Sequence, residues 1–448
     1  MRQLTVILSI LVLPILARAQ ESSVPMELGV HDAVKYAWEN SQKTKDAAID
    51  VIQADKDVWI QASRGLPIVN GSFGFNNFLD LPTSIIPAEA FGAPPGSPNI
   101  EAQFGQPWTM EAGVNASLQL FDGTYIVGVK GAKGFQKMSR DIEKMTRNEV
   151  KTMIGQAYYT SQIAKENVRL LNENITNMEK TLEETEALYK EGFSEEMDVE
   201  QLDLLINQIK NRALAAERQH EATLNLLKYQ MGMPIETKIT LTDDLETLWG
   251  LQANEELMAM ELDLNNNLQY DIMKQDVVMH GYLVGLEKAK YYPRLHAFFD
   301  YRQQAFRDEF DFFDFDEPWF PQTLWGVQLS VPIWDNLGGV ARIKKAKLEQ
   351  QKVQNRLEDT ERALKMQAIT AKDDFNSALE QLETSDKNVA LAARIKEKTL
   401  IRYQEGLATS MELTQAENQQ IQAQTEYINT LFKAMDAKLQ MKVVLENN

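Results

Sequence analysis

Apolar and polar residues alternate most regularly between Trp108 and Leu120. The apolar set and the polar set are, respectively, Trp108, Met110, Ala112, Val114, Ala116, Leu118, Leu120 and Thr109, Glu111, Gly113, Asn115, Ser117, Gln119. A period of two predicts a β-strand. A length of about 13 residues exceeds an ordinary globular strand and matches the ~9–11 tilted residues that cross a bilayer in a barrel. The same pattern predicts four strands, over about 66–78, 108–121, 294–303 and 323–334.

Long segments of helical periodicity follow the strands. No proline occurs between Tyr125 and about Tyr189, which predicts a helix of about 65 residues, roughly 100 Å long at 1.5 Å per residue. Residues spaced alternately by three and four predict a coiled-coil seam with one polar member: Val168, Leu171, Ile175, Met178, Leu182, Thr185 and Tyr189. Gly192 ends this helix, and a second helix runs to about Met231. We therefore expect an antiparallel helical hairpin.

The second half of the chain repeats this order. We expect a helix from about Glu255 to Tyr291, a break at Pro293, two strands, a helix from about Gly339 to a break at Gly406, and a last helix. The turn residues Tyr189, Glu191, Gly192, Met197 and Asp198 correspond at a constant offset to Tyr403, Glu405, Gly406, Met411 and Glu412. The predicted fold class is mainly α with membrane β, built from a duplicated helix–strand–strand–long helix–helix unit. Its expected parts are a first repeat, a linker and a second repeat, over residues 20–234, 235–251 and 252–448.

The amino-terminal segment and the composition indicate an exported protein that is not lipidated on cysteine. Residues 1–19 combine Arg2, an apolar run and the small residues Ala17 and Ala19, which predicts a cleaved secretory signal. The absence of cysteine excludes disulfides, thiolate metal sites and an acylated N-terminal cysteine. A net charge of −19 argues against nucleic acid as a partner.

No motif for catalysis, a metal or a cofactor is present in the sequence. The four histidines are scattered and form no zinc-binding pattern. Glycines cluster where a strand becomes a helix, but their spacing is too irregular for a phosphate-binding loop. The acidic and aromatic segment 306–322 lacks the spacing of a calcium loop, so we expect a solvated extracellular loop. We expect a protein that is not an enzyme.

Four amphipathic strands cannot close a membrane barrel, because lipid tolerates no unpaired strand edge and barrels need about eight strands or more. If three chains contribute four strands each, a barrel of about twelve strands forms, and the helices continue it as a tube. A tube joined to a barrel is a conduit. The alternative is an exported coiled-coil structural or adaptor protein, whose strands form a small soluble sandwich with a less continuous apolar stripe.

Several motifs resemble one known family in their order, duplication and spacing. They are the strand-to-helix junctions LFDG (120–123) and IWDNLGG (333–339), the breaks at Pro67 and Pro293, the turns YKEGFSEEMDV and YQEGLATSMEL, and the early segment LGVHDAVKYAWENS. Over essentially its whole mature length the chain resembles the TolC-type outer-membrane efflux protein family.

This resemblance implies a homotrimer with a shared twelve-strand barrel in outer-membrane lipid, an α-helical barrel through the periplasm and an equatorial layer that includes residues 235–251. It also implies the exit duct of a tripartite efflux pump or a type I secretion system. A periplasmic adaptor and an inner-membrane transporter are the implied partners, and the transporter supplies the energy. Drug efflux, metal efflux and protein secretion all remain open.

The resemblance places the two helical turns at the periplasmic tip, where the tube is closed and the adaptor engages. Rings of carboxylates from Asp198 and Glu412 would favour cations there, although both are equally explained as first-turn acids that complement a helix dipole. Gln415 gives no support to a second acidic ring. Tyr189 and Tyr403 either form hydrogen bonds across helices or are plain seam positions. Backbone geometry explains the turn glycines Gly192 and Gly406. The predicted junction between the β-barrel and the helices, where glycines allow close backbone approach, comprises Phe121, Asp122, Gly123, Trp334, Asp335, Gly338 and Gly339.

Overall fold

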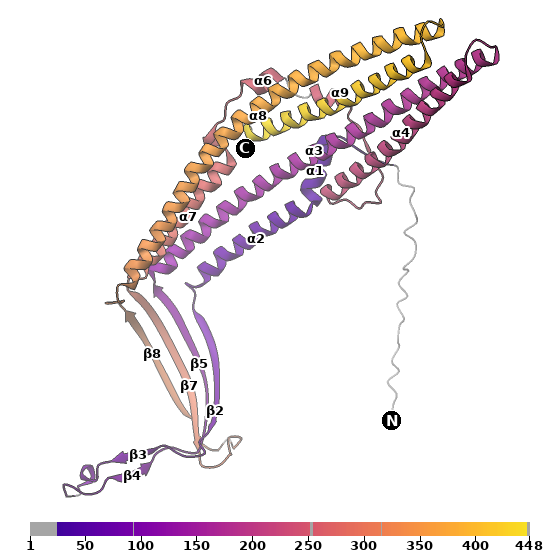
Figure 1. Cartoon of the computed structure of the whole chain (residues 1–448). Helices are drawn as coiled ribbons and strands as arrows, with labels where there is room; N and C mark the ends of the chain where they lie inside the picture. The colour runs from indigo at the N-terminus through magenta and orange to yellow at the C-terminus, as the bar shows by residue number, and fades with distance from the viewer. Residues whose placement is uncertain (1–24, 93, 251–253, 315, 446–448) are drawn as a thin grey trace, which may run out of the picture. The chain divides into compact units, whose positions relative to one another are not determined.

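The computed structural model describes residues 25–92, 94–250, 254–314 and 316–445 (Figure 1). The predicted signal segment, 1–19, lies outside these residues. The chain divides into two compact units, and each combines segments from both halves of the sequence. We call residues 47–145 and 263–364 the sheet unit. The turn unit holds the described residues of 1–46, 146–262 and 365–447.

The sheet unit contains one four-stranded antiparallel sheet in the order β2-β5-β7-β8. Its strands are β2 (Ile68–Asn77), β5 (Trp108–Phe121), β7 (Arg294–Arg307) and β8 (Phe320–Ser330). Strand β7 runs four residues beyond the expected 303, and β8 ends at Ser330 rather than near 334. Among the described residues, the outer edges of β2 and β8 pair with no other strand.

The strand register separates an apolar face from a polar face. Val114 lies opposite Gly71 and Tyr301, while its neighbour Asn115 lies opposite Asn70 and Asp300. Because side chains alternate between faces along each strand, one face of the sheet is mainly apolar and the other mainly polar, although Phe298, Phe306 and Leu324 lie on the polar face. The apolar face is exposed to solvent in the single chain, and Phe73, Trp325, Val327 and Leu329 are all more than half exposed.

The connection between β2 and β5 has structure that the sequence did not predict. Residues 78–107 contain a two-stranded hairpin, β3 (Thr83–Ile86) and β4 (Ile100–Gln103), with a short 3₁₀ helix at Ala88–Phe91 (Figure 1). The strands escaped notice because each has only four residues and prolines surround them. We refer to residues 78–107 as the hairpin loop.

Helices make up most of the described chain: α1 (Val30–Asn40), α2 (Gln42–Ser63), α3 (Gly123–Lys190), α4 (Glu196–Met231), α5 (Leu245–Gly250), α6 (Asn254–Ala259), α7 (Leu268–Ala289), α8 (Gly338–Gln404) and α9 (Ser410–Leu445). Helix α3 has 68 residues, close to the expected length. Within the described segments, no helix is both long and apolar enough to cross a membrane.

One expected helix is interrupted. The single helix predicted from Glu255 to Tyr291 is wrong, because α6, a 3₁₀ turn and α7 occupy that stretch. The Asp263 side chain accepts a hydrogen bond from the Asn265 amide at 2.9 Å, and Asn267 caps α7. Short polar side chains that bind the backbone compete with helix continuation. Nearer the amino terminus, α1 ends at Asn40 with Ser41 as its C-cap, and α2 begins directly afterwards at Gln42.

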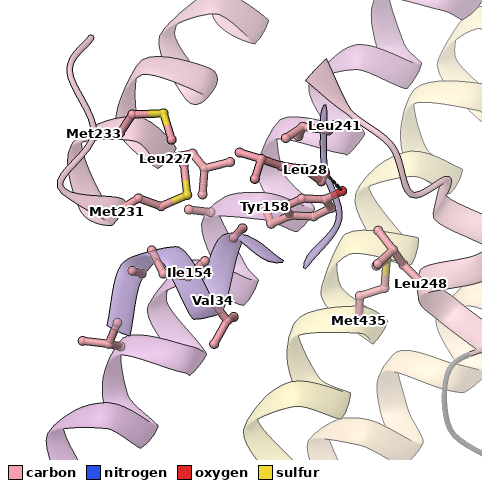
Figure 2. Packing of buried hydrophobic residues seen from close by; sticks show 14 of the residues in the cluster. Leu28, Val34, Ile154, Tyr158, Leu227, Met231, Met233, Leu241, Leu248 and Met435 are labelled. Carbon is pink, nitrogen blue, oxygen red and sulfur yellow. Dashed lines mark hydrogen bonds between the residues drawn. The ribbon is translucent and has the colours of Figure 1, made fainter. Parts of the chain in front are cut away.

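The linker between the two halves, residues 235–251, is ordered in its described part. Its strand β6 (Ile239–Leu241) pairs in parallel with β1 (Met26–Leu28), and a cluster of buried side chains surrounds them (Figure 2). Tyr158 is fully buried in that cluster and its hydroxyl donates to the Leu28 carbonyl at 2.9 Å. Burial raises the pKa of Tyr158 to about 12, so the hydroxyl stays neutral and donates at any physiological pH.

Asp243 of the linker completes the first helix. The residue that precedes α1 is Gly29, which has no side chain to cap the helix. Asp243 supplies the missing acceptor, since its Oδ2 atom accepts a hydrogen bond from the Val30 amide at 2.7 Å. The N-terminal segment is therefore fixed by a residue that lies 213 positions later.

The predicted coiled-coil seam is confirmed in the turn unit from Val168 to Thr185, and its last predicted member, Tyr189, is exposed. Leu171 and Met178 of α3 are buried against α4 and α9, with Val168, Ile175 and Leu182 partly buried beside them. Their partners are Leu205, Ile206, Ile209, Ala213, Ala216 and Ile421. This packing holds the helices that lead to the two turns.

Adjacent leucines test this account of the core. Leu227 is fully buried and Leu226 is 47% exposed. We expect Leu227→Ala to lower the free energy of unfolding by about 2–5 kcal/mol, because it leaves a cavity. Leu226→Ala is the matched control, with an expected loss of roughly 1 kcal/mol or less. Guanidinium denaturation followed by circular dichroism measures both, and equal losses would contradict the assignment.

Candidate functional site

The α3–α4 turn ends its first helix with a glycine in the left-handed conformation. Gly192 has a φ of 83°, its amide donates to the Tyr189 carbonyl at 3.0 Å, and the Phe193 amide donates to the Leu188 carbonyl at 2.8 Å. This pair of bonds is the Schellman motif, which satisfies carbonyls that the helix end leaves free. The role of Gly192 in the turn is therefore a backbone role.

The α8–α9 turn repeats this geometry. Gly406 has a φ of 72°, its amide donates to the Tyr403 carbonyl at 2.9 Å, and the Leu407 amide donates to the Arg402 carbonyl at 2.7 Å. Neither glycine has another atom within 4 Å of the position of an added Cβ. Backbone conformation alone, and not crowding, therefore selects glycine at both turns.

Each predicted tip acid binds the start of the helix that follows its turn. The Asp198 Oδ2 atom accepts hydrogen bonds from the Ser194 hydroxyl at 3.0 Å and the Glu195 amide at 3.2 Å. The Glu412 Oε2 atom accepts from the Thr409 amide at 2.8 Å, and the Thr409 hydroxyl accepts from the Glu412 amide at 3.2 Å. Both arrangements are capping boxes.

Asp198 also contacts the second turn. Burial alone would raise its pKa, but the polar groups of Ser410, Glu195 and Ser194 around the carboxylate outweigh that effect and hold the pKa below its usual value. The carboxylate is therefore ionised at neutral pH. Ser410 in turn donates its hydroxyl to the Gln201 Oε1 atom at 2.7 Å.

Tyr403 joins the two long helices. Its hydroxyl lies 3.2 Å from the Thr185 hydroxyl, which itself donates to the Thr181 carbonyl. Tyr403 is therefore the donor to Thr185. Burial and the nearby Asp198 carboxylate raise the pKa of Tyr403, so it stays protonated. Beside it, the Gln404 amide donates to the Glu184 carboxylate at 3.0 Å.

The two predicted tyrosines differ. Tyr189 is 43% exposed, and within the described residues its hydroxyl makes no hydrogen bond. The sequence marked Thr185 only as a polar member of an apolar seam, and it missed Gln201 and Ser410 as bonded partners. The spacing Thr409-x-x-Glu412 was the available signal for a capping box, but a bond between Thr185 and Tyr403, 218 residues apart, leaves no local pattern.

The two junction aspartates, in the sheet unit, stabilise the start of the long helices. Asp122 is 8% exposed and accepts from the Thr124 amide and hydroxyl, each at 2.7 Å. Asp335 accepts from the Tyr291 hydroxyl at 3.1 Å and pairs with Arg342 at 3.2 Å. Two exposed aromatic residues, Phe121 and Trp334, and the glycine Gly338 flank these positions.

Close packing explains the two junction glycines at the helix starts. A Cβ on Gly123 would lie 2.6 Å from the Tyr292 ring, and one on Gly339 would overlap the Tyr291 hydroxyl. Both contacts are too short for any side chain. In contrast, Asn336 and Leu337 between β8 and α8 hold positive φ values of 56° and 60°, which only the second junction shows.

Among the described residues, no group of three or more acidic or histidine side chains is placed to hold a metal ion. The geometry at the turns offers hydrogen bonds and a negative charge, and it brings no nucleophile and base together.

The family model described as outer membrane efflux protein matches residues 34–232 and 260–445. The chain belongs to the outer membrane efflux protein family. The match in two segments agrees with the duplication seen in the sequence. Membership identifies the chain as an efflux channel of the outer membrane. No curated protein sequence matches the chain significantly.

Solved structures of outer membrane efflux channels share the fold at low sequence identity. The Neisseria gonorrhoeae MtrE channel, described in its open state, has a TM-score of 0.72 and 15% identity, covering 93% of this chain and 88% of that one. The Vibrio cholerae outer membrane protein VceC has a TM-score of 0.69 and 16% identity, with coverage of 93% and 95%. The Campylobacter jejuni CmeC channel gives 0.69 and 16%, with 93% and 85%. The duplicated helical fold with its membrane strands is thus the fold of these channels.

The turn glycines can be tested separately from the rest of this efflux channel. We expect Gly406→Ala to destabilise the α8–α9 turn by roughly 1–2 kcal/mol, because alanine pays a steric cost in the left-handed region. Amide exchange of the turn, followed by mass spectrometry, should then be about 5–30-fold faster. Gly250→Ala is the control, since Gly250 has ordinary φ and open space. Unchanged exchange in Gly406→Ala would show that the turn does not need glycine.

Proposed function

We propose that three copies of this chain assemble into a passive duct that carries cargo across the outer membrane and the periplasm. The observation that supports this most directly is the four-stranded sheet, which has an apolar face and two unpaired edges. In lipid, every backbone donor and acceptor needs a partner, so β8 of one copy pairs with β2 of the next. Three copies give a closed barrel of about twelve strands, which is within the range of known barrels.

The helices continue this duct through the periplasm, and the two turns form its inner end. A periplasmic adaptor binds near the turns, and an inner-membrane transporter supplies the energy. The chain itself needs no cofactor and no catalytic group for this task, because conduction requires only an open path. Its cargo is set by the transporter, whether the system exports drugs, metals or proteins.

The hydrogen bond between Tyr403 and Thr185, together with the contact between Asp198 and Ser410, joins the helix pair α3–α4 to the helix pair α8–α9 within one chain. We infer that this contact favours a closed tip and that the adaptor shifts the balance toward an open one. The carboxylates of Asp198 and Glu412 also give the tip a negative field, which favours cations at a narrow entrance.

The mass of the assembled protein is the first test. Mature chain extracted from outer-membrane fractions in mild detergent is expected to have the protein mass of three copies, by light scattering corrected for bound detergent. This expectation rests on closure of the sheet, which only association provides. A monomer or dimer that stays dispersed without detergent would overturn the duct and favour a soluble coiled-coil protein.

Ion selectivity tests the tip acids. Replacing Asp198 and Glu412 together by alanine is expected to reduce the preference for cations in single-channel recordings, since it removes two carboxylates per chain. Asp198→Asn with Glu412→Gln removes the same charge but keeps side chains that can cap the helices. The same loss in both double variants assigns the effect to charge. Unchanged selectivity in both would show that these acids do not line the entrance.

A further inference from the structure

A cavity of about 260 Å³ lies in the sheet unit where the hairpin loop crosses the polar face of the sheet. The sheet contributes Glu111 of β5 with Gln304 and Phe306 of β7. The hairpin loop contributes Phe78, Phe104 and Gln106. Strands β5 and β7 hold these residues in register, because Glu111 lies opposite Gln304 and Thr109 lies opposite Phe306.

The cavity is aromatic and carries a negative charge. Glu111 is the only charged side chain among its described lining residues, and three phenylalanines surround the same space. The Glu111 Oε2 atom accepts only one long hydrogen bond, from Gln304 at 3.4 Å. Its other oxygen has no hydrogen-bond partner among the described residues.

The nearest part of the polar face does not cancel this charge. Arg302 stands two positions before Gln304 on β7, and its Nε atom pairs with Asp300 at 2.8 Å. Arg302 also lies within electrostatic range of Glu111, but no hydrogen bond or ion pair joins the two side chains. Glu111, Asp300 and Arg302 together therefore carry one net negative charge. A second acceptor also lacks a partner, since the Oε1 atom of Gln106 is buried without a hydrogen bond. Buried acceptors without donors cost free energy, which a ligand with positive charge or donor groups recovers.

We propose that this cavity binds a small organic cation that has a quaternary ammonium or protonated amine group beside an apolar body. Phenylalanine faces attract such a group through their quadrupoles, and the Glu111 carboxylate supplies the opposite charge. An anion would meet the same carboxylate and be repelled. A neutral apolar molecule would leave Glu111 and Gln106 desolvated and unpaired. A metal ion needs more oxygen ligands than one carboxylate and scattered amides give it.

The place of this site in transport rests on the proposed function. If three chains close a barrel, the polar face lines the channel, and three such sites lie in the barrel beside the hairpin loops. Cations in transit then meet a ring of weak sites beside the hairpin loops. Binding of the cation requires only the folded chain and not an open duct. The cation site and the duct can therefore be tested separately.

Calorimetric titration of the purified full-length protein in detergent tests the site with benzyltrimethylammonium as the probe. We expect saturable binding, and we expect benzenesulfonate, an anion of similar size, to show none. Glu111→Gln keeps the shape of the side chain and should weaken binding by about tenfold, because it removes the charge. Phe104→Ala should weaken it about two- to fivefold through loss of one aromatic face. Phe104 is 59% exposed, so this variant tests the site even if Glu111→Gln disturbs the sheet.

Glu101→Gln is the matched control. Glu101 is an exposed acid of β4 in the same hairpin loop, and it does not line the cavity. Its loss should leave the affinity unchanged. Absence of saturable binding, equal binding of the anion, or an equal effect of Glu101→Gln and Glu111→Gln would each overturn the proposal.

Conductance measurements separate failure of the site from failure of the duct. In planar bilayers, benzyltrimethylammonium added on the side of the hairpin loops should reduce the current through the wild-type channel more than through Glu111→Gln. Conduction without such block and without calorimetric binding would reject the cation site and leave the duct intact. Calorimetric binding to a protein that conducts no ions would support the site and reject the duct.

Discussion

The need to pair every backbone hydrogen-bonding group governs this protein. Strands β2 and β8 leave their outer edges open in the single chain, and the apolar face between them is exposed. Neither feature is stable in water or in lipid for a lone sheet. The sheet therefore needs further strands at both of its edges. In an assembly that supplies them, the long helices take the same symmetry as the sheet. Duplication within the chain doubles the number of strands and helices that each copy brings.

Local pattern determined what the sequence predicted well. Strand β5 was foreseen because its alternation has no exception between Trp108 and Leu120, and the helical seam because apolar residues recur at spacings of three and four. The break after α6 was missed because residues 255–291 contain no proline, and only the capping bonds of Asp263 and Asn267 interrupt the helix. The hairpin of β3 and β4 was missed because four-residue strands between prolines leave too short a period to detect.

At the turns, local pattern identified the residues but not their hydrogen-bond partners on other helices. Glycines and first-turn acids follow from helix geometry, so Gly192, Gly406, Asp198 and Glu412 were visible in the sequence. The bond from Tyr403 to Thr185 was not, because nothing in one helix specifies which residue of another helix lies beside it. The two halves of the chain therefore differ at Tyr189 and Tyr403, although these residues occupy corresponding positions in the two turn motifs. One tyrosine binds a neighbouring helix and the other is exposed to solvent.

Asp243 and strand β6 have a consequence for the order of folding. The first helix of the chain receives its cap from Asp243, and the first strand receives its partner from β6, more than 200 residues later. During synthesis, β1 and α1 therefore cannot complete their contacts until β6 and Asp243 have been made. Contacts of such long sequence separation close slowly, because the intervening chain must be ordered before they form. The contacts of β1 and α1 would then be among the last to form in the turn unit, after the first half of the chain has folded.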